Sequence, residues 1–197
     1  MIVSEVARVI GSVPGLAEKS YLELGTAFGA TFNAISAREK VGVDVSPSCS
    51  GIFCGTTDSF FAGLDPGRRF DVIYIDASHH YPDVLSDYNH AVQHLAEDGY
   101  LFLHDLYPPH QGYTSFDLCG DAYMLLAYLL TLSRAFKMYV TDPKELGGYG
   151  LTLIRYPLPI DPPREAGSVG YEEFIERMKG ERLWTFADLI GELGRTM

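Results

Sequence analysis

A strand, glycine turn and helix pattern near the N-terminus decides how this chain can fold. Residues 21–31 read YLELGTAFGAT, in which a short apolar run ends in Glu23, two glycines follow four residues apart, and an apolar helical pattern begins. This order predicts a buried strand, a tight turn and a helix N-terminus, a geometry that brings backbone N–H groups against a ligand. A second strand pattern over residues 41–44 ends in Asp44, where an acid can contact the hydroxyls of a ribose.

The glycine spacing separates two kinds of nucleoside cofactor. A dinucleotide site needs G-x-G-x-x-G so that a pyrophosphate can approach bare backbone, but the frame here reads Gly25, Ala27 and Ala30. Glu23 would repel a diphosphate, whereas it suits a cofactor with a cationic amino acid end. The pattern Glu23-x-Gly25-x-x-x-Gly29 resembles the first motif of class I S-adenosylmethionine (SAM) methyltransferases. The alternative is an ordinary strand-to-helix turn of an α/β protein, with the acids capping turns.

Strand-like and helix-like patterns alternate along the chain, which predicts a parallel α/β fold. Strands are expected over residues 20–24, 40–45, 51–54, 70–76, 99–104, 136–140 and 150–156. Helices are expected over residues 4–10, 30–38, 57–62, 82–96, 120–132, 171–179 and 183–193. The last two strands lie too close in sequence for a crossover, so they should pair antiparallel. We therefore expect a Rossmann-like class I methyltransferase, with a seven-stranded mostly parallel sheet, a C-terminal antiparallel hairpin and helices on both faces.

A change in composition predicts a boundary after residue 156. Pro157, Pro159, Pro162 and Pro163 indicate a stiff extended linker, and two amphipathic helical patterns follow it. We expect a methyltransferase domain over residues 1–156 and a linker with a helical appendage over residues 157–197. The appendage would pack on a partner subunit, roof the site or cap the core.

The net charge and the cysteines limit which binding partners and which cellular compartment are expected. The net charge of −11 leaves no basic stripe for a nucleic acid backbone, and no apolar run reaches membrane-spanning length. The chain opens without a secretory signal pattern. Cys49, Cys54 and Cys119 form no C-x-x-C pair, so reduced, buried thiols and a cytoplasmic location are expected.

Acids and imidazoles follow two neighbouring strands of the predicted sheet. Strand 70–76 ends in Asp76, three residues before His79, and strand 99–104 ends in His104 and Asp105. Ligands of open parallel sheets bind outside the carboxyl ends of the strands, so these side chains should share one crevice. Such groups form a divalent metal site or an acid–base site. The oxygen ligands favour Mg²⁺ over zinc.

The same segment carries a second resemblance. The spacing I-D-x-x-H-x-Y-x-x-V-x-x-D over residues 75–87, then L-x-x-x-G over residues 95–99, then His104-Asp105, resembles a bacterial class I methyltransferase family of small-molecule and glycan tailoring enzymes. Residues 55–61 resemble the segment that covers the adenine in this family, and residues 120–123 resemble its later Gly-Asp helix start. Related metal-dependent sugar O-methyltransferases hold magnesium on an acid after strand four and an acidic pair after strand five. The resemblance thus implies a metal on Asp76, His104 and Asp105, with His104 replacing one acid.

The predicted site follows from these patterns. Cofactor contacts are expected from Glu23, Gly25, Thr26, Phe28, Gly29, Asp44, Thr57, Asp58 and Asp76. Asp58 has the alternative role of a helix N-cap. Catalysis is expected from Asp76, His79 and His104, and either histidine would accept the proton. Strand alternation should send the side chains of His104 and Asp105 to different sides unless the strand stops there, so that one of them, preferably Asp105, contacts the chemistry.

The resemblance implies SAM-dependent O-methylation, with or without magnesium, of a hydroxyl on a sugar, a glycan or a related small metabolite. Catechol-like acceptors are an alternative substrate class. A non-catalytic SAM-binding partner subunit and an NAD-dependent reductase are alternative functions. A homodimer is expected.

Overall fold

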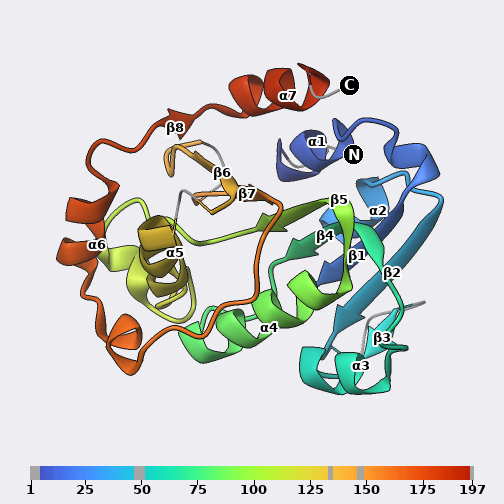
Figure 1. Ribbon diagram of the computed structural model, residues 1–197, viewed down its shortest axis with the longest axis horizontal. Helices are drawn as coiled ribbons and strands as arrows, with labels where there is room; N and C mark the ends of the chain where they lie inside the picture. The colour runs from blue at the N-terminus through green and yellow to red at the C-terminus, as the bar shows by residue number, and fades with distance from the viewer. Residues whose placement is uncertain (1–4, 47–51, 133–134, 146–148, 196–197) are drawn as a thin grey trace.

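A single eight-stranded sheet organises the computed structural model, which describes residues 5–46, 52–132, 135–145 and 149–195 (Figure 1). The strand order is β3-β2-β1-β4-β5-β7-β6-β8, and β7 is antiparallel to both of its neighbours. The strands are β1 (Ser20–Leu24), β2 (Glu39–Asp44), β3 (Phe53–Cys54), β4 (Phe70–Ile75), β5 (Leu95–Leu103), β6 (Lys137–Thr141), β7 (Thr152–Arg155) and β8 (Leu183–Trp184).

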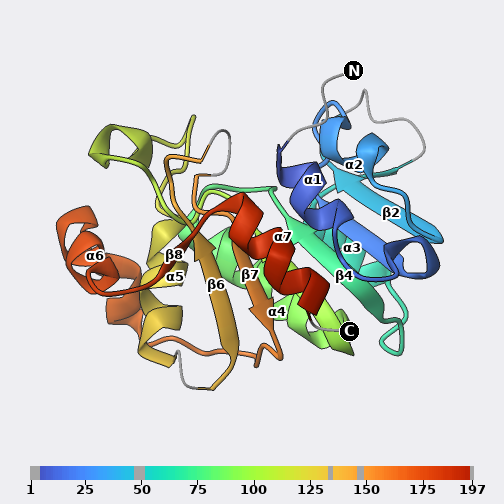
Figure 2. The same ribbon diagram turned by 90° about the horizontal axis from the view of Figure 1, so that it is seen from above.

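Helices cover both faces of the sheet. They are α1 (Glu5–Gly11), α2 (Ala30–Ala34), α3 (Thr57–Gly63), α4 (Tyr81–His94), α5 (Tyr123–Leu129), α6 (Tyr171–Met178) and α7 (Phe186–Arg195). Short 3-10 turns are η1 (Leu16–Glu18), η2 (Gln111–Thr114), η3 (Leu130–Leu132) and η4 (Arg164–Ser168). In Figures 1 and 2, α1 and α7 lie on one face of the sheet and α4 on the other.

Alternating side chains of the central strands divide the core in two. In β4, Ile73 and Ile75 join the cluster under α4 and α5, whereas Val72 and Tyr74 join the cluster under α1 and α7. All four are essentially buried, because successive residues of a strand face opposite sides and helices cover both. The predicted α/β sheet with helices on both faces and a terminal antiparallel hairpin is confirmed.

The prediction of seven strands is wrong by one, because residues 183–184 form β8 instead of the start of a helix. Leu183 and Trp184 pair with the parallel strand β6. A reciprocal cap then fixes the start of α7: the Thr185 hydroxyl accepts from the Asp188 N–H at 3.0 Å, and the Asp188 carboxylate accepts from the Thr185 N–H at 3.2 Å.

Two helices end earlier than their patterns predict. Helix α4 ends at His94 because Leu95 is extended and opens β5, whose pairing with β4 is irregular between Phe70 and Val72. Helix α2 ends at Ala34, because Ile35 is extended and the Lys40 ammonium group donates to the carbonyl of Ile35 at 3.0 Å. Local propensity is overridden in both places by contacts that form only in the folded sheet.

The residues after 156 pack against the sheet and its helices. The segment that leaves β7 is tied to α4, because the Asn89 side chain exchanges two hydrogen bonds with the backbone of Ile160. Phe174 of α6 is fully buried in one core cluster, and Leu189 of α7 is fully buried in the other. The tail thus completes both cores, and the domain boundary at residue 156 stays a prediction.

Two further expectations concern membranes and cysteines. No helix among the described residues is long and apolar enough to cross a bilayer. Cys119 is a buried free thiol, as expected. The expectation of a buried, reduced thiol is wrong for Cys54, which lies exposed on the edge strand β3 and is disulfide-bonded. The third cysteine, Cys49, lies outside the described residues.

Replacing Phe174 with alanine tests whether the tail belongs to the cooperative fold. Phe174→Ala should lower the free energy of unfolding by roughly 3–5 kcal/mol, because it opens a cavity between α5 and α6. Glu172→Ala, on the exposed face of the same helix, should change it by less than about 0.5 kcal/mol. Urea unfolding followed by circular dichroism measures both, and equal effects would show that α6 is a loosely attached appendage.

Candidate functional site

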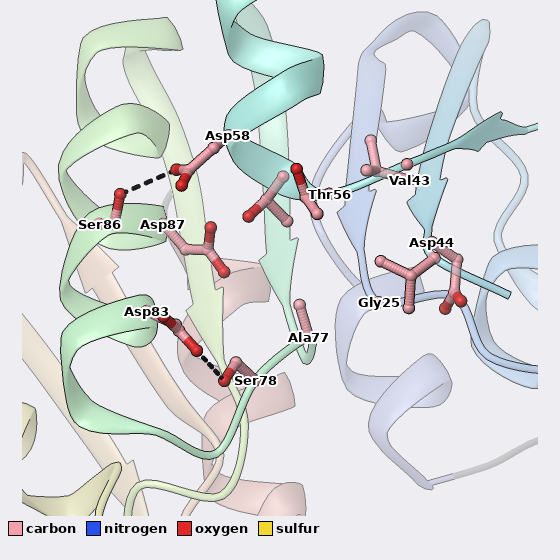
Figure 3. Close-up of a pocket in the computed structure, with 13 residues that line it drawn as sticks. Gly25, Val43, Asp44, Thr56, Asp58, Ala77, Ser78, Asp83, Ser86 and Asp87 are labelled. Carbon is pink, nitrogen blue, oxygen red and sulfur yellow. Dashed lines mark hydrogen bonds between the residues drawn. The ribbon is translucent and has the colours of Figure 1, made fainter.

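A cavity of about 340 Å³ lies at the carboxyl ends of the first strands, as expected for an open parallel sheet (Figure 3). Its walls come from the turn after β1, the end of β2, the start of α3, the segment after β4 and one face of α4. The lining residues are Gly25, Val43, Asp44, Val45, Gly55, Thr56, Thr57, Asp58, Ala77, Ser78, Asp83, Ser86 and Asp87. Its volume falls in the range of small-molecule sites.

The turn after β1 depends on Gly25. Its φ of +85° belongs to the left-handed region, and a Cβ there would lie 2.0 Å from the carbonyl oxygen of Asp76. Two backbone hydrogen bonds hold this approach, from the Gly25 N–H to Val43 and from the Asp76 N–H to Leu24, both at 2.8 Å. The turn therefore packs directly on the end of β4, and only glycine fits.

Asp44 closes the glycine turn from the end of β2. Its carboxylate accepts hydrogen bonds from the N–H of Ala27 at 2.6 Å and from the N–H of Ser46 at 2.7 Å. Ala27 has a φ of +45°, a strained value for a residue with a Cβ. The carboxylate that was predicted to contact a ribose thus lies on the cavity rim and orders the turn.

The predicted cofactor residues divide into those that line the cavity and those that do not. Gly25, Asp44, Thr57 and Asp58 line it. Thr56 caps α3 by accepting from the Ser59 N–H at 3.1 Å, so the cap predicted for Asp58 belongs to Thr56. The Asp58 carboxylate accepts instead from the Ser86 hydroxyl at 3.1 Å.

The other predicted cofactor residues lie elsewhere. Thr26 is buried, Phe28 is 96% exposed, Gly29 precedes α2, and Asp76 faces a second cluster. Glu23 is 1% exposed and accepts a hydrogen bond from the Tyr21 hydroxyl at 2.5 Å. Burial raises the pKa of Glu23 to about 7, although the bond from Tyr21 lowers it. Glu23 therefore supports the turn from beneath and does not line the cavity.

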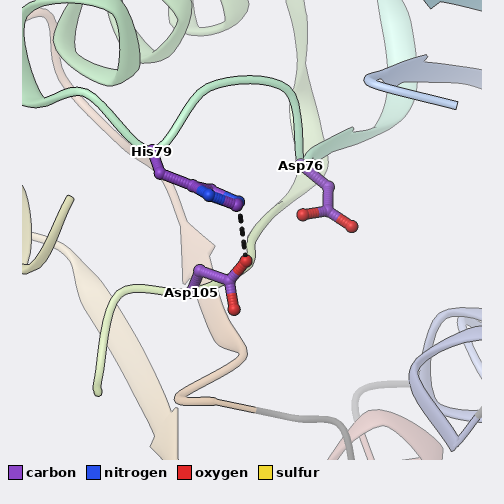
Figure 4. A group of neighbouring side chains, drawn as sticks. All are labelled: Asp76, His79 and Asp105. Atoms are coloured by element: carbon purple, nitrogen blue, oxygen red, sulfur yellow. Dashed lines mark ion pairs between the residues drawn. The ribbon is translucent and has the colours of Figure 1, made fainter. Parts of the chain in front are cut away.

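Asp76, His79 and Asp105 form the second cluster, at the ends of β4 and β5 (Figure 4). One possible ligand atom from each lies within 4.8 Å of the others, and His79 Nε2 lies 3.0 Å from Asp105 Oδ2. The parallel pairing of Ile75 with Leu103 brings the two strand ends to the same level. The predicted convergence of these side chains is found in the structure.

His104 lies beside this cluster between its two acids. Its Nδ1 is 3.3 Å from Asp76 and 3.2 Å from Asp105. The side chains of His104 and Asp105 do not point to different sides, because β5 ends at Leu103, which is the exception expected for strand alternation, and Asp105 adopts a φ of +60°. That left-handed residue turns both side chains toward the same place.

The pKa values of His104, Asp105 and His79 are shifted because these groups lie close to one another and are shielded from water. Burial opposes the protonation of His104, but Asp76 and Asp105 outweigh it and raise its pKa well above the usual value. Burial likewise opposes the ionisation of Asp105, but hydrogen bonds to His104 and His79 hold its pKa far below the usual range. The hydrogen bond to Asp105 raises the pKa of His79, and burial opposes it.

The loop that carries His79 is clamped by Gly120 and Asp121. Gly120 has a φ of +56°, and a Cβ there would lie 2.1 Å from the His79 carbonyl oxygen. The Asp121 N–H donates to that carbonyl at 3.1 Å, and the Asp121 carboxylate accepts from the N–H of Tyr81. The Gly-Asp pair that was predicted to open a helix therefore holds the His79 loop, and α5 begins two residues later.

The donors of the second cluster fit a divalent cation. Two carboxylates and an imidazole suit hard and borderline ions such as Mg²⁺ and Mn²⁺. Protonated His104 lies against both carboxylates and would compete with such an ion for them. His90 and His94, one turn apart on α4, instead pack their rings on Phe61.

One residue of the cavity, Asp87, was not predicted although the helical pattern of the sequence indicated it. Asp87 was expected only as the last position of the motif over residues 75–87, yet it is 1% exposed and lines the cavity. It lies between the buried residues Val84 and Ala91 on the apolar face of α4. An acid on that face was visible in the helical period of the sequence.

Comparisons with known proteins agree with this architecture. Residues 33–106 match a family model described as a methyltransferase domain, and this stretch contains Asp44, Asp76, His79 and Asp105. No curated protein matches the sequence at a significant level.

Several solved structures share the fold at low sequence identity. An O-methyltransferase from Bacillus cereus in complex with SAH is 13% identical with a TM-score of 0.58, over 78% of this chain and 80% of its own. A putative O-methyltransferase from Klebsiella pneumoniae is 13% identical with a TM-score of 0.59, over 80% and 82%. A SAM-bound amino pentose methyltransferase from Micromonospora echinaspora is 14% identical with a TM-score of 0.52, over 78% and 89%.

These findings confirm the predicted fold. Residues 33–106 match a model of a methyltransferase domain, and the chain shares the fold of solved O-methyltransferase structures. The eighth strand, β8, is the one departure from the expected seven-stranded sheet.

Gly25→Ala tests the close approach of the two strand ends. The added Cβ meets backbone atoms and a left-handed φ, so the free energy of unfolding should fall by at least about 2 kcal/mol. Gly63→Ala is the matched control, because nothing lies within 4 Å of a Cβ there. Chemical denaturation compares them, and a stable Gly25→Ala protein would contradict the described turn.

Glu23→Gln tests the cost of the buried carboxyl group. Its folded pKa of about 7 lies above the unfolded 4.5, so the folded state holds a proton that the unfolded state has lost. Stability should therefore fall as the pH rises from about 4.5 to 7, by roughly 3 kcal/mol for this group. Between pH 5 and pH 8 the variant should lose less stability than the wild type, and parallel curves would refute the assignment.

Proposed function

We propose that this protein is a SAM-dependent O-methyltransferase that acts on a hydroxyl of a sugar, a glycan or a related small metabolite. One observation carries the proposal. The segment after β4 faces the cavity with Ala77 and Ser78, and it supplies the second cluster with Asp76 and His79. A nucleoside site and a group of acid–base side chains thus share one four-residue segment.

The cavity is proposed to hold the adenosine part of SAM. Asp44 on its rim offers a carboxylate to ribose hydroxyls. The left-handed turn at Gly25 keeps that wall free of a side chain, so that a ligand can approach the backbone. Glu23 is buried beneath the turn, and we propose that it contributes by stabilising the turn.

In methyl transfer from SAM, the acceptor hydroxyl needs activation more than the methyl donor does. SAM supplies an activated methyl sulfonium, whereas a hydroxyl must lose its proton as its oxygen attacks the methyl carbon and the S–C bond breaks. His79 is proposed to take that proton at Nδ1, which lies 3.2 Å from the Phe116 carbonyl oxygen, because its Nε2 faces Asp105. Asp105 orients the ring from 3.0 Å and stabilises the imidazolium that forms.

His104 is proposed to have a different role from the one expected. It is largely buried between Asp76 and Asp105, and these two acids favour its cationic form. A histidine that stays protonated cannot accept the acceptor's proton. His104 would instead hold both carboxylates in place and balance their charge.

A metal-assisted variant of the reaction uses the same side chains. Asp76, His79 and Asp105 would hold the ion, and a bound divalent cation lowers the pKa of a hydroxyl that contacts it. His79 cannot serve as a ligand and as the base through the same nitrogen. Dependence of the activity on added Mg²⁺ or Mn²⁺, and its loss with a chelator, separates the two variants.

The apolar and aromatic surroundings support a ring-shaped acceptor. Tyr113 and Tyr149 pack against each other with centroids 5.3 Å apart, and Tyr149 also lies edge-to-face with His104 at 6.2 Å. Aromatic faces of this kind pack on sugar rings and on phenols alike. The predicted homodimer and the predicted cytoplasmic location stay predictions.

His79→Gln tests the proposed base. Methyl transfer to a panel of sugar and catechol acceptors, followed as S-adenosylhomocysteine (SAH) production, should fall roughly 100- to 10,000-fold. Affinity for SAH by calorimetry should change less than about threefold, because His79 lies outside the cavity. His80→Gln is the matched control, since His80 stacks on Phe116 away from the acids of the cluster.

Three outcomes would contradict the proposal in different ways. An unchanged rate in His79→Gln removes the proposed base. SAH binding without transfer to any acceptor favours a non-catalytic SAM-binding subunit. Thermal stabilisation by NAD and not by SAH would favour a reductase.

A further inference from the structure

Asp87 of α4 is a buried acid with an unsatisfied oxygen in the cavity wall. The residue is 1% exposed, and Figure 3 shows its carboxyl group directed from α4 into the cavity. The Thr57 side chain supplies one hydrogen bond. The other oxygen, Oδ1, is buried and has no hydrogen-bond partner among the described residues. A buried polar atom without a partner is costly, so this oxygen is suited to a ligand that donates.

The two neighbouring acids of the cavity wall already accept hydrogen bonds from serine hydroxyls. Asp58 accepts from the Ser86 hydroxyl at 3.1 Å, and Asp83 accepts from the Ser78 hydroxyl at 2.8 Å. Burial raises the pKa of Asp87 to about 7, with a smaller contribution from the charges of Asp58 and Asp83, although the bond from Thr57 lowers it. Of the three acids on this wall, Asp87 is thus the most deeply buried and keeps an acceptor for a ligand.

The position of Asp87 matches the base end of a bound nucleoside. Asp44, the proposed ribose contact, lies at one side of the cavity, and Asp87 lies at the opposite side on α4 (Figure 3). The described lining contains acids and hydroxyls but no lysine, arginine or histidine. Such a wall accepts hydrogen bonds, and it therefore favours a base edge that donates them.

Adenine and hypoxanthine differ at this edge. Adenine carries an exocyclic amino group, which donates, whereas hypoxanthine carries a carbonyl oxygen at the same position, which accepts. Against the ionised form of Asp87 the amino group gains a charge-assisted hydrogen bond, and the carbonyl oxygen meets repulsion. The neutral acid can donate to that carbonyl, so the titrations are made at about pH 8.5, above the Asp87 pKa of about 7. A site built around a polar group rejects the analogue that cannot pair with it.

We propose that Asp87 selects the adenine of SAM, with Oδ1 accepting a hydrogen bond from the exocyclic amino group. The inference rests on the proposed function, because it assumes that the cavity holds the adenosine part of SAM. It adds a specificity-determining residue that lies on α4, away from the strand ends that supply the other proposed contacts.

Calorimetric titration of the full chain with SAH and with its deaminated analogue, S-inosylhomocysteine, tests this role. The wild type should bind SAH at least tenfold more tightly than the inosine analogue. Asp87→Leu, which keeps a similar volume without an acceptor, should lower SAH affinity about tenfold or more and bring the ratio close to one. Asp98→Asn is the matched control, because Asp98 is exposed and does not line the cavity, and it should keep the wild-type ratio.

A second variant keeps the test decisive if Asp87→Leu does not fold. Asp87→Asn offers an amide that can accept from adenine or donate to the carbonyl of hypoxanthine, so it should bind both ligands with similar affinity. A wild-type ratio in Asp87→Asn or Asp87→Leu would overturn the inference and leave the proposed function standing. Equal binding of both ligands by the wild type would do the same, whereas no binding of SAH by the wild type would overturn both.

Discussion

The backbone contact between Gly25 and Asp76 is the constraint on which the site depends. The turn after β1 lies so close to the end of β4 that a single Cβ would overlap the Asp76 carbonyl group. On one side of this contact the turn forms a wall of the cavity, and on the other side Asp76 enters the charged cluster. The position of each site relative to the other is therefore fixed by main-chain packing.

The buried acids on the two sides of the contact between Gly25 and Asp76 differ in how easily they ionise. In the cluster, the cationic form of His104 balances Asp76 and Asp105, and Asp105 remains ionised although it is buried. Among the described residues, no cationic side chain lies at hydrogen-bond distance from Glu23 or Asp87, and burial raises the pKa of both to about 7. Neighbouring opposite charges thus stabilise ionised groups where proton transfer is proposed, whereas burial opposes the ionisation of Glu23 beneath the turn and of Asp87 in the cavity wall.

Much of this arrangement was predictable from the sequence, because it follows from strand order. The apolar run before Gly25 and the run that ends in Asp76 mark buried strands, and parallel strands bring their carboxyl ends together. The convergence of Asp76, His79 and Asp105 follows from the same rule.

What the sequence did not reveal depends on contacts between distant segments or on single backbone angles. The two residues of β8 are a strand only because β6 offers them an edge. The left-handed φ of Asp105 turns His104 toward the acids, and no pattern of residue types in the sequence predicts this backbone angle. Asp87 is the exception, because its place on the apolar face of α4 was readable from the helical period.

A crystal structure of the complex with SAH would test the central claim most directly. In that complex the ribose hydroxyls are expected to contact Asp44, the base to lie toward α4, and the sulfur to lie beside residues 76–79, facing His79. SAH bound elsewhere, or bound in the cavity with its sulfur directed away from Asp76 and His79, would contradict the assignment of one continuous site.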